Sequence, residues 1–159
     1  MEEIAYIEDI IFVGKQNIPW SQVETYLKQY IGKRYVVKET GDVINVSADF
    51  PEEFAESKYT KNLRGNLSKA KANASQVIGK LIVIAKNKRW LENKNDKHNK
   101  DAVKGWYRYD TYFAMPVQGS NEEDKRVNIY RATLVVRNSL KGLYLYDVIN
   151  IKKEASKPL

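Results

Sequence analysis

The sequence contains no cysteine and a single histidine, and both shortages narrow the chemistry open to it. Without cysteine there are no disulfides, thiolate zinc sites or cysteine nucleophiles, and we expect a reducing, cytoplasmic compartment. The carboxylates show no ligand spacing, so we assign no metal ligand and no cofactor. The phosphate-binding patterns GxxxxGK[ST] and GxGxxG are missing, as is the GxSxG elbow of serine hydrolases, although a Ser-His-Asp arrangement stays open.

Long hydrophobic runs are also missing. No segment approaches the roughly 20 apolar residues that a membrane-spanning helix needs. The acidic start MEEIAYIEDIIFVG has no basic region before its short apolar run, so we expect no signal peptide. With 159 residues, of which 43% are hydrophobic and 30% charged, the chain fits one domain with a core.

Basic residues outnumber acidic ones, but the excess is confined to one part of the chain. The formal net charge is +7, and residues 58–108 alone carry fourteen Lys and Arg against three acidic residues. That segment has a net charge of +11, which leaves −4 for the rest. A concentrated basic segment favours a nucleic acid as partner. The alternative is a solvated, lysine-rich face that keeps the protein soluble.

The first half of the chain mixes helical and extended patterns. Ser21 and Glu24 have the spacing of a capping box, so a helix of about three turns is expected after Ser21, with Gly32 as its stop. Residues 34–39 and 42–48 carry β-branched residues on both sides of a Thr-Gly-Asp turn, which predicts a hairpin. The other elements expected here are a short strand at 9–13 and a helical turn that starts at Pro51.

One long helix is predicted between residues 62 and 85, where apolar residues recur every three or four positions. Lys69, Lys71 and Lys80 lie off this apolar stripe, so we expect them to be solvated rather than catalytic. Residues 86–105 lack a sustained apolar period and are rich in Asn and Lys, which predicts a long exposed connection.

The last third of the chain has the alternation of β-strands. WYRYDTYFAMPV, VNIYRATLVVR and LYLYDVINIKK are separated by short polar segments, which predicts an antiparallel meander. The expected fold class is α+β, with amino-terminal helices packed on a carboxy-terminal antiparallel sheet of about four strands. The single domain 1–159 would comprise a helix and hairpin in 1–60, the long helix and a basic loop in 61–105, the meander in 106–153 and a frayed tail in 154–159.

The alternation also predicts which face of the meander is buried. In the second strand Tyr130, Ala132, Leu134 and Val136 share one side, while Arg131, Thr133, Val135 and Arg137 share the other. Asp147 falls on the apolar side of the third strand, where a bulge or a turn-linked hydrogen bond would explain it. The opposite face then combines arginine with tyrosine, as RNA-binding sheets do for phosphate contacts and base stacking. Its residues are Arg108, Tyr112, Arg131, Arg137, Tyr144 and Tyr146.

The polar segment KHNKDAVKG, residues 97–105, holds the only histidine, His98. Metal-free RNA cleavage by the ribose 2′-OH needs a proton acceptor, a proton donor and cations around the phosphate. His98, with an ordinary pKa of about 6.5, fits one proton-transfer role. A tyrosine or a lysine would supply the other role, with Arg108 and Arg131 on the phosphate. The alternative is that His98 is a surface residue.

Four segments carry a family resemblance: GDVINVSADFPEEFAESKYT, KAKANASQVIGKLI, KHNKDAVKGWYRYDTYFAMPV and NIYRATLVVRNSLKGLYLYDVINIKKE. The region that contains them, about two thirds of the chain, resembles a domain carried by phages and other mobile elements, among the large polyvalent protein-associated domains. Their order also resembles the phage branch of the barnase, EndoU, colicin and RelE-like nuclease superfamily. Members of that superfamily combine amino-terminal helices with a four-stranded antiparallel sheet that cleaves RNA without metal.

The resemblance implies roles for individual residues. It puts His98 in the histidine-loop position, Arg131 on the middle strand, and Tyr144 and Tyr146 in the last strand. The single histidine departs from the two-histidine mechanism of EndoU-like enzymes and leaves a RelE-like cationic mechanism open.

We therefore expect a phage or mobile-element protein that acts on RNA as a metal-independent endoribonuclease, with His98, Arg131 and Tyr146 as catalytic residues. A toxin of this kind would have an immunity partner. The alternative is a non-catalytic module that binds nucleic acid or a host protein. The residues expected to contact nucleic acid are Lys71, Lys97, Lys104, Arg108, Tyr112, Arg137 and Tyr144.

Overall fold

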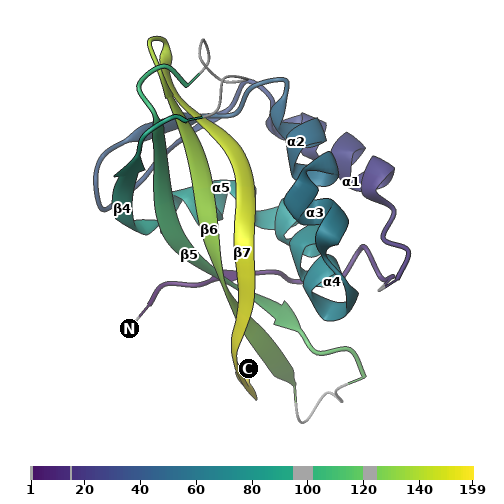
Figure 1. Ribbon diagram of the computed structural model, residues 1–159. Helices are drawn as coiled ribbons and strands as arrows, with labels where there is room; N and C mark the ends of the chain where they lie inside the picture. The colour runs from purple at the N-terminus through teal and green to yellow at the C-terminus, as the bar shows by residue number, and fades with distance from the viewer. Residues whose placement is uncertain (1, 15, 95–101, 120–124) are drawn as a thin grey trace.

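The computed structural model describes residues 2–14, 16–94, 102–119 and 125–159. Short elements fill the first half and three long strands fill the second (Figure 1). The strands are β1 (Ala5–Tyr6), β2 (Arg34–Val36), β3 (Val43–Asn45), β4 (Lys86–Leu91), β5 (Trp106–Pro116), β6 (Arg126–Ser139) and β7 (Gly142–Pro158). The helices are α1 (Trp20–Leu27), α2 (Phe50–Glu56), α3 (Lys58–Asn62), α4 (Gly65–Ala74) and α5 (Ile78–Val83), with 3-10 turns at Lys28–Tyr30 and Ser75–Val77.

All the described strands belong to one mixed sheet, in the order β1-β5-β6-β7-β3-β2, with β4 also paired to β5. The α+β class, the meander β5-β6-β7 and the hairpin β2-β3 agree with the sequence-based prediction. The expected antiparallel sheet of about four strands is wrong, because the sheet is larger and the pairs β1-β5 and β3-β7 are parallel. Each parallel pair joins strands about a hundred residues apart, which local alternation does not reveal.

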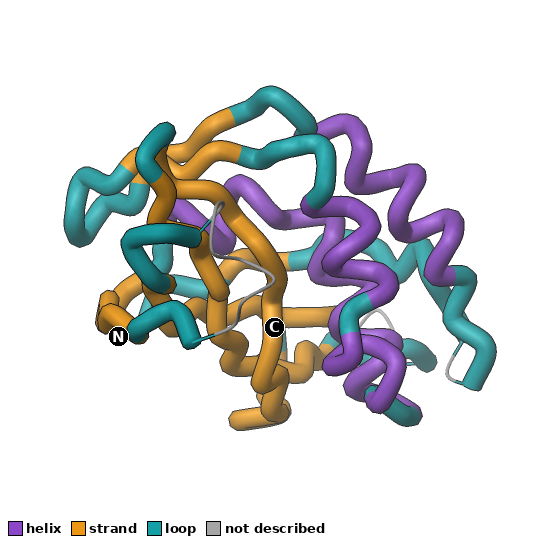
Figure 2. The backbone as a smooth tube through the Cα atoms, turned by 45° about the horizontal axis from the view of Figure 1, so that its top comes forward, coloured by secondary structure: helices purple, strands orange, loops and turns teal. Residues whose placement is uncertain are grey.

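The hydrophobic core lies on one face of the sheet, called here the inner face. Tyr109 and Phe113 of β5 and Leu134 of β6 are completely buried there together with Leu81 and Ile82 of α5. Figure 1 shows α5 behind β5 and β6, with α2, α3 and α4 gathered beyond β7, and Figure 2 shows the longer helices together on one side of the strands. The other face of the sheet is called the outer face. No helix in the described part of the chain is long and apolar enough to cross a membrane.

The helix predicted over residues 62–85 is interrupted between α4 and α5 by a 3-10 turn. The buried hydroxyl of Ser75 donates a hydrogen bond to the carbonyl of Ala72 at 2.6 Å and so competes with the helical pattern at this point. Gly79 allows α5 to approach β2 closely, because a Cβ atom there would lie 2.5 Å from the ring of Tyr35.

Three further segments differ from the sequence-based expectations. Residues 86–91 of the expected connection form β4, and residues 154–158 of the expected frayed tail continue β7 and pair with β6. Ser21 lies inside α1, which begins at Trp20 and has no side-chain cap. Most residues of β4 and of the end of β7 are exposed. These strands therefore lack the apolar alternation by which a sequence predicts a strand.

The segment 9–13, predicted as a strand, is held by a side chain instead of by a neighbouring strand. Asn73, completely buried on α4, accepts hydrogen bonds from the backbone N–H groups of Ile11 and Phe12 at 3.0 and 3.2 Å. Its amide also donates to the Phe12 carbonyl at 2.9 Å. One side chain thus satisfies backbone groups that a strand partner would otherwise bind.

Asn73→Ala is therefore expected to lower the free energy of unfolding by about 2–4 kcal/mol, because the backbone groups of residues 11 and 12 lose their partners. Urea denaturation measures this loss. The matched control is Asn66→Ala, at an exposed position of the same helix, which should stay within about 0.5 kcal/mol of the parent protein. Equal stability of the two variants would contradict the role given to Asn73.

Candidate nucleic-acid interface

The register of β5, β6 and β7 places the predicted arginines and tyrosines on the outer face. Residues directly opposite each other in antiparallel strands project to the same side. Trp106, Arg137 and Tyr144 form one such row across the three strands. Tyr112 stands opposite Arg131 further along β5 and β6.

A bulge in β7 explains the unusual position of Asp147. Val135 pairs with Asp147 and Val136 pairs with Leu145, so Tyr146 is the extra residue. The bulge leaves Leu145 on the inner face and brings the ring of Tyr146 to the outer face, where its centroid lies 5.0 Å from that of Trp106. The bulge that the sequence suggested at this position is confirmed.

Three arginines from three different strands share the outer face with one buried carboxylate, which binds two of them. Arg89 of β4 lies directly opposite Arg108 of β5, and we call these two and Arg131 of β6 the arginine cluster. Asp110 is the carboxylate: its oxygens lie 3.1 Å from Nη2 of Arg89 and 3.0 Å from Nη2 of Arg131. The Asp110 side chain is 5% exposed, whereas those of Arg89 and Arg131 are 44% and 47% exposed. The carboxylate therefore orients two guanidinium groups that remain open to solvent.

Asp110 stays ionised at neutral pH. Burial alone would raise its pKa, but a hydrogen bond from the amide of Asn87 and the charges of Arg89 and Arg131 together lower the pKa below its ordinary value. Asp110 neutralises only one of the three arginines. The arginine cluster consequently keeps a net positive charge.

Arg108 has no counter-ion among the described residues. In the part of the chain that the structure describes, no hydrogen bond or ion pair engages its side chain, and its Nε atom is buried without a partner. Arginine N–H donors that are removed from water without acceptors are costly, and a bound anion would satisfy them.

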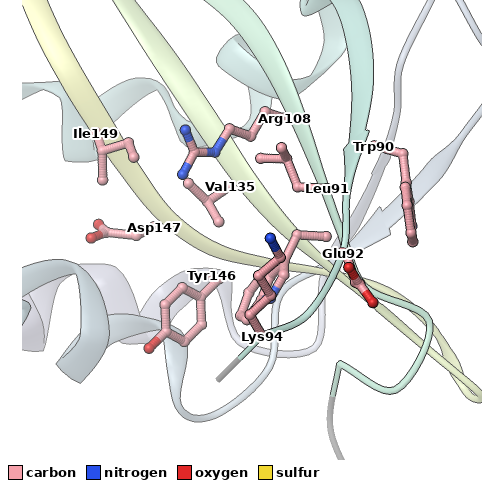
Figure 3. Close-up of a pocket in the computed structure, with 10 residues that line it drawn as sticks. Trp90, Leu91, Glu92, Lys94, Arg108, Val135, Tyr146, Asp147 and Ile149 are labelled. Atoms are coloured by element: carbon pink, nitrogen blue, oxygen red, sulfur yellow. The ribbon is translucent and has the colours of Figure 1, made fainter. Parts of the chain in front are cut away.

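The Arg108 side chain lines a pocket of about 620 Å³ that opens on the outer face (Figure 3). The volume falls within the range usual for small-ligand sites, roughly 300–1,000 Å³. Its lining includes Leu91, Trp106, Arg108, Val135, Tyr146 and Ile149. The pocket thus offers apolar and aromatic surface together with one guanidinium group, and Glu92 and Lys94 also line it.

The ring of Tyr146, rather than its hydroxyl, faces the pocket. Burial, followed by a hydrogen bond from its hydroxyl to Glu53 of α2, raises the pKa of Tyr146 well above its ordinary value. The hydroxyl is therefore protonated at neutral pH and already engaged by Glu53. Asp147 also lines the pocket, but its carboxylate binds Lys71 of α4.

Two of the basic residues predicted on the surface are buried. The expectation that Lys71 is solvated is wrong: its side chain is 0% exposed, and its ammonium lies 2.7 Å from Asp147 and 2.6 Å from the hydroxyl of Thr60. Lys69 is buried as well and binds Gln118. The apolar stripe predicts that only one face of the helix is buried. In the structure α4 contacts both β5 and β7, so side chains outside the stripe are buried as well.

Arg137 is also buried, at 6% exposure, and holds α2 on the sheet. Its guanidinium pairs with Asp49, which precedes α2, and donates to the hydroxyl of Ser47 at 3.1 Å. It also lies over the rings of Tyr144 and Tyr146, at 5.6 and 5.9 Å from their centroids. Arg137 therefore has little surface left for a ligand.

The remaining predicted residues are distributed unevenly. Tyr112 is half-buried beside Arg131, and Lys104 is exposed next to the pocket, where its carbonyl accepts a hydrogen bond from the indole of Trp90 at 2.7 Å. His98 and Lys97 lie outside the described residues. The prediction missed Arg89, because β4 has no apolar alternation and was interpreted as part of a connection.

Acidic residues from distant parts of the chain neutralise much of the basic segment. Glu2 binds Lys86 at 2.7 Å, and Asp42 binds Lys88 at 2.8 Å. With Asp110 on Arg89 and Asp147 on Lys71, these pairs reduce the local excess of charge. The arginine cluster supplies most of the positive charge that remains beside the pocket, whose lining also includes Lys94 and Glu92.

No family model, curated protein or solved structure matches this chain.

Proposed function

We propose that the protein binds RNA on the outer face of its sheet. The observation that carries this proposal is the arginine cluster, which presents guanidinium groups from three strands beside a pocket with aromatic walls. Guanidinium groups bind phosphate oxygens in pairs, and aromatic rings stack on bases. The resemblance to phage and mobile-element domains supports the same proposal and suggests such an origin.

Cleavage of the bound RNA without metal is a second candidate, favoured by the unpaired guanidinium of Arg108. A cation that is free to bind the phosphate would stabilise the charge that develops on it during attack by the 2′-OH. His98 is the residue proposed for proton transfer. Tyr146 is a weak candidate for the second proton-transfer role, since its hydroxyl donates to Glu53.

One set of incubations tests both activities. A fluorescent single-stranded RNA of mixed sequence is titrated with protein in EDTA at about 50 and about 200 mM salt. We expect micromolar or tighter binding at the lower salt, with affinity that falls steeply at the higher salt because counterions are released. Unchanged anisotropy up to about 100 μM protein contradicts RNA binding, since that is the weak end of non-specific affinities.

The same samples, separated on a gel, show whether the RNA is cut. Products with 2′,3′-cyclic phosphate ends from the parent protein, but not from His98→Ala, would establish metal-independent cleavage that depends on His98. Intact RNA with both proteins, in samples where binding is seen, assigns the chain to the non-catalytic alternative. A host or immunity protein as the principal partner would be favoured if RNA is neither bound nor cut.

A further inference from the structure

Two aromatic rings form a corner in the pocket beside Arg108. The ring centroids of Trp106 and Tyr146 are 5.0 Å apart and the ring planes are inclined by 65°. The hydrogen bond of Tyr146 to Glu53 and that of the Trp106 indole to Asn93 at 3.3 Å hold both rings in place. A flat ligand that stacks on one ring would therefore touch the edge of the other, an arrangement that aromatic groups favour.

The remaining lining has an aliphatic part and a charged part. The charged part comprises Arg108 and Lys94 together with the carboxylates of Glu92 and Asp147, of which Asp147 binds Lys71. Leu91, Val135 and Ile149 contribute aliphatic surface, and Arg108 contributes a guanidinium that no carboxylate in the described ranges pairs with. A ligand that satisfies both parts must be flat and apolar at one end and anionic at the other. A nucleotide has this chemistry, because its base can stack and its phosphate can accept paired hydrogen bonds.

We propose that the pocket takes one unpaired nucleotide, with its base against Trp106 and Tyr146 and its phosphate on the guanidinium of Arg108. This inference rests on the proposed RNA binding and names the part of the RNA that the site selects. The bases of a duplex are stacked and do not reach such a pocket, so single strands and loops are the expected targets. Arg89 and Arg131 then lie along the outer face, where they can contact neighbouring phosphates.

Binding of small ligands tests the pocket separately from the RNA. Adenosine 5′-monophosphate, adenosine and ribose 5-phosphate are titrated into ¹⁵N-labelled protein, and the indole N–H resonance of Trp106 is followed by NMR. The resonance is assigned with Trp106→Leu. We expect the monophosphate to bind about tenfold or more tightly than either fragment, since adenosine lacks the phosphate for Arg108 and ribose 5-phosphate lacks the base that stacks.

Variants define the two halves of the site. Arg108→Gln and Trp106→Leu should each weaken binding of the monophosphate about tenfold, through loss of the charge and of the stacking surface respectively. Arg126→Gln is the matched control: Arg126 belongs to the same strand as Arg131 but to the other face of the sheet, and this variant should bind within about twofold of the parent protein. Circular dichroism of Trp106→Leu checks that the variant is folded, and Arg108→Gln keeps the test decisive if it is not.

The outcomes separate this inference from the proposed function. Equal affinity for the monophosphate and ribose 5-phosphate would overturn it, because the pocket would then be an anion site only. Binding of RNA without any binding of the monophosphate would overturn it as well and leave the proposed function intact. Binding of the monophosphate without binding of RNA would support the nucleotide pocket and contradict RNA as the ligand.

Discussion

Lys71→Met should lower the free energy of unfolding by about 3–5 kcal/mol, the usual cost of leaving a buried charge without its partner. The ammonium of Lys71 and the carboxylate of Asp147 lie 2.7 Å apart, with side chains 0% and 4% exposed. Methionine has nearly the length of lysine and can occupy the space beside the rings of Phe54 and Tyr59. The decrease in the free energy of unfolding therefore measures the cost of leaving Asp147 buried without its partner, and not the cost of a cavity. Urea or thermal denaturation measures it.

The double variant Lys71→Met/Asp147→Asn is the control for this prediction. Asparagine can still accept the hydrogen bond that the N–H of Val148 gives to Asp147 at 2.8 Å, and no buried charge remains. We expect the double variant to recover at least half of the stability lost in Lys71→Met, because buried ion pairs contribute little net stability. A loss below about 1 kcal/mol in Lys71→Met itself would show that the pair is not buried as described.

The cost of Lys71→Met should also depend on pH. Burial raises the pKa of Asp147 above its ordinary value of 3.8, and removing Lys71 removes the charge that opposes this rise. Between the ordinary and the raised pKa, the folded protein binds a proton that the unfolded chain does not bind. The Lys71→Met variant therefore becomes more stable as the pH falls from the raised pKa of Asp147 toward the ordinary value. The variant should accordingly lose less stability, relative to the parent protein, at about pH 5 than at about pH 8.

Replacing Arg89, Arg108 and Arg131 together by glutamine should weaken RNA binding about a hundredfold at low salt. Three phosphate contacts at roughly 1 kcal/mol each give this factor. The slope of log affinity against log salt should become flatter by about 2, since each lost contact with single-stranded RNA removes about 0.7. Fluorescence anisotropy across a range of salt concentrations measures both quantities.

A charge-matched control distinguishes the arginine cluster from general basicity. Lys28, Arg64 and Arg126 lie in the first 3-10 turn, between α3 and α4, and on the inner side of β6. Replacing these three by glutamine gives the same net charge and should change affinity less than about fivefold, because the side chains lie away from the outer face. Equal losses in the two triple variants would contradict a localised interface.

The arginine cluster depends on Asp110 for its geometry. Two guanidinium groups share this carboxylate, which fixes their positions before any ligand binds. Preorganised donors lose less conformational entropy on binding than flexible lysines do. The basic segment of the sequence therefore acquires a defined interface from a few ordered side chains rather than from its total charge.

Local patterns in the sequence determined several features correctly. Alternation of apolar residues in 106–153 predicted the three long strands, and the inner-face positions of Tyr130 and Leu134 followed from the same alternation. The position of Asp147 on the apolar side suggested either a bulge or a turn-linked hydrogen bond, and the bulge is present. The turn after residue 39 indicated the hairpin β2-β3. These features depend on backbone geometry and side-chain burial within a few residues, which is why a single sequence contains them.

The tertiary structure alone decided how distant segments meet. The parallel pairs β1-β5 and β3-β7, the pairing of β4 with β5, and the burial of Lys71 all depend on contacts between residues far apart in the chain. The same holds for Asp110, which lies about twenty residues from both Arg89 and Arg131 and orients them. Composition gives the number of charges, but pairing in space decides which of them stay available, because an ion pair needs proximity that sequence distance does not encode.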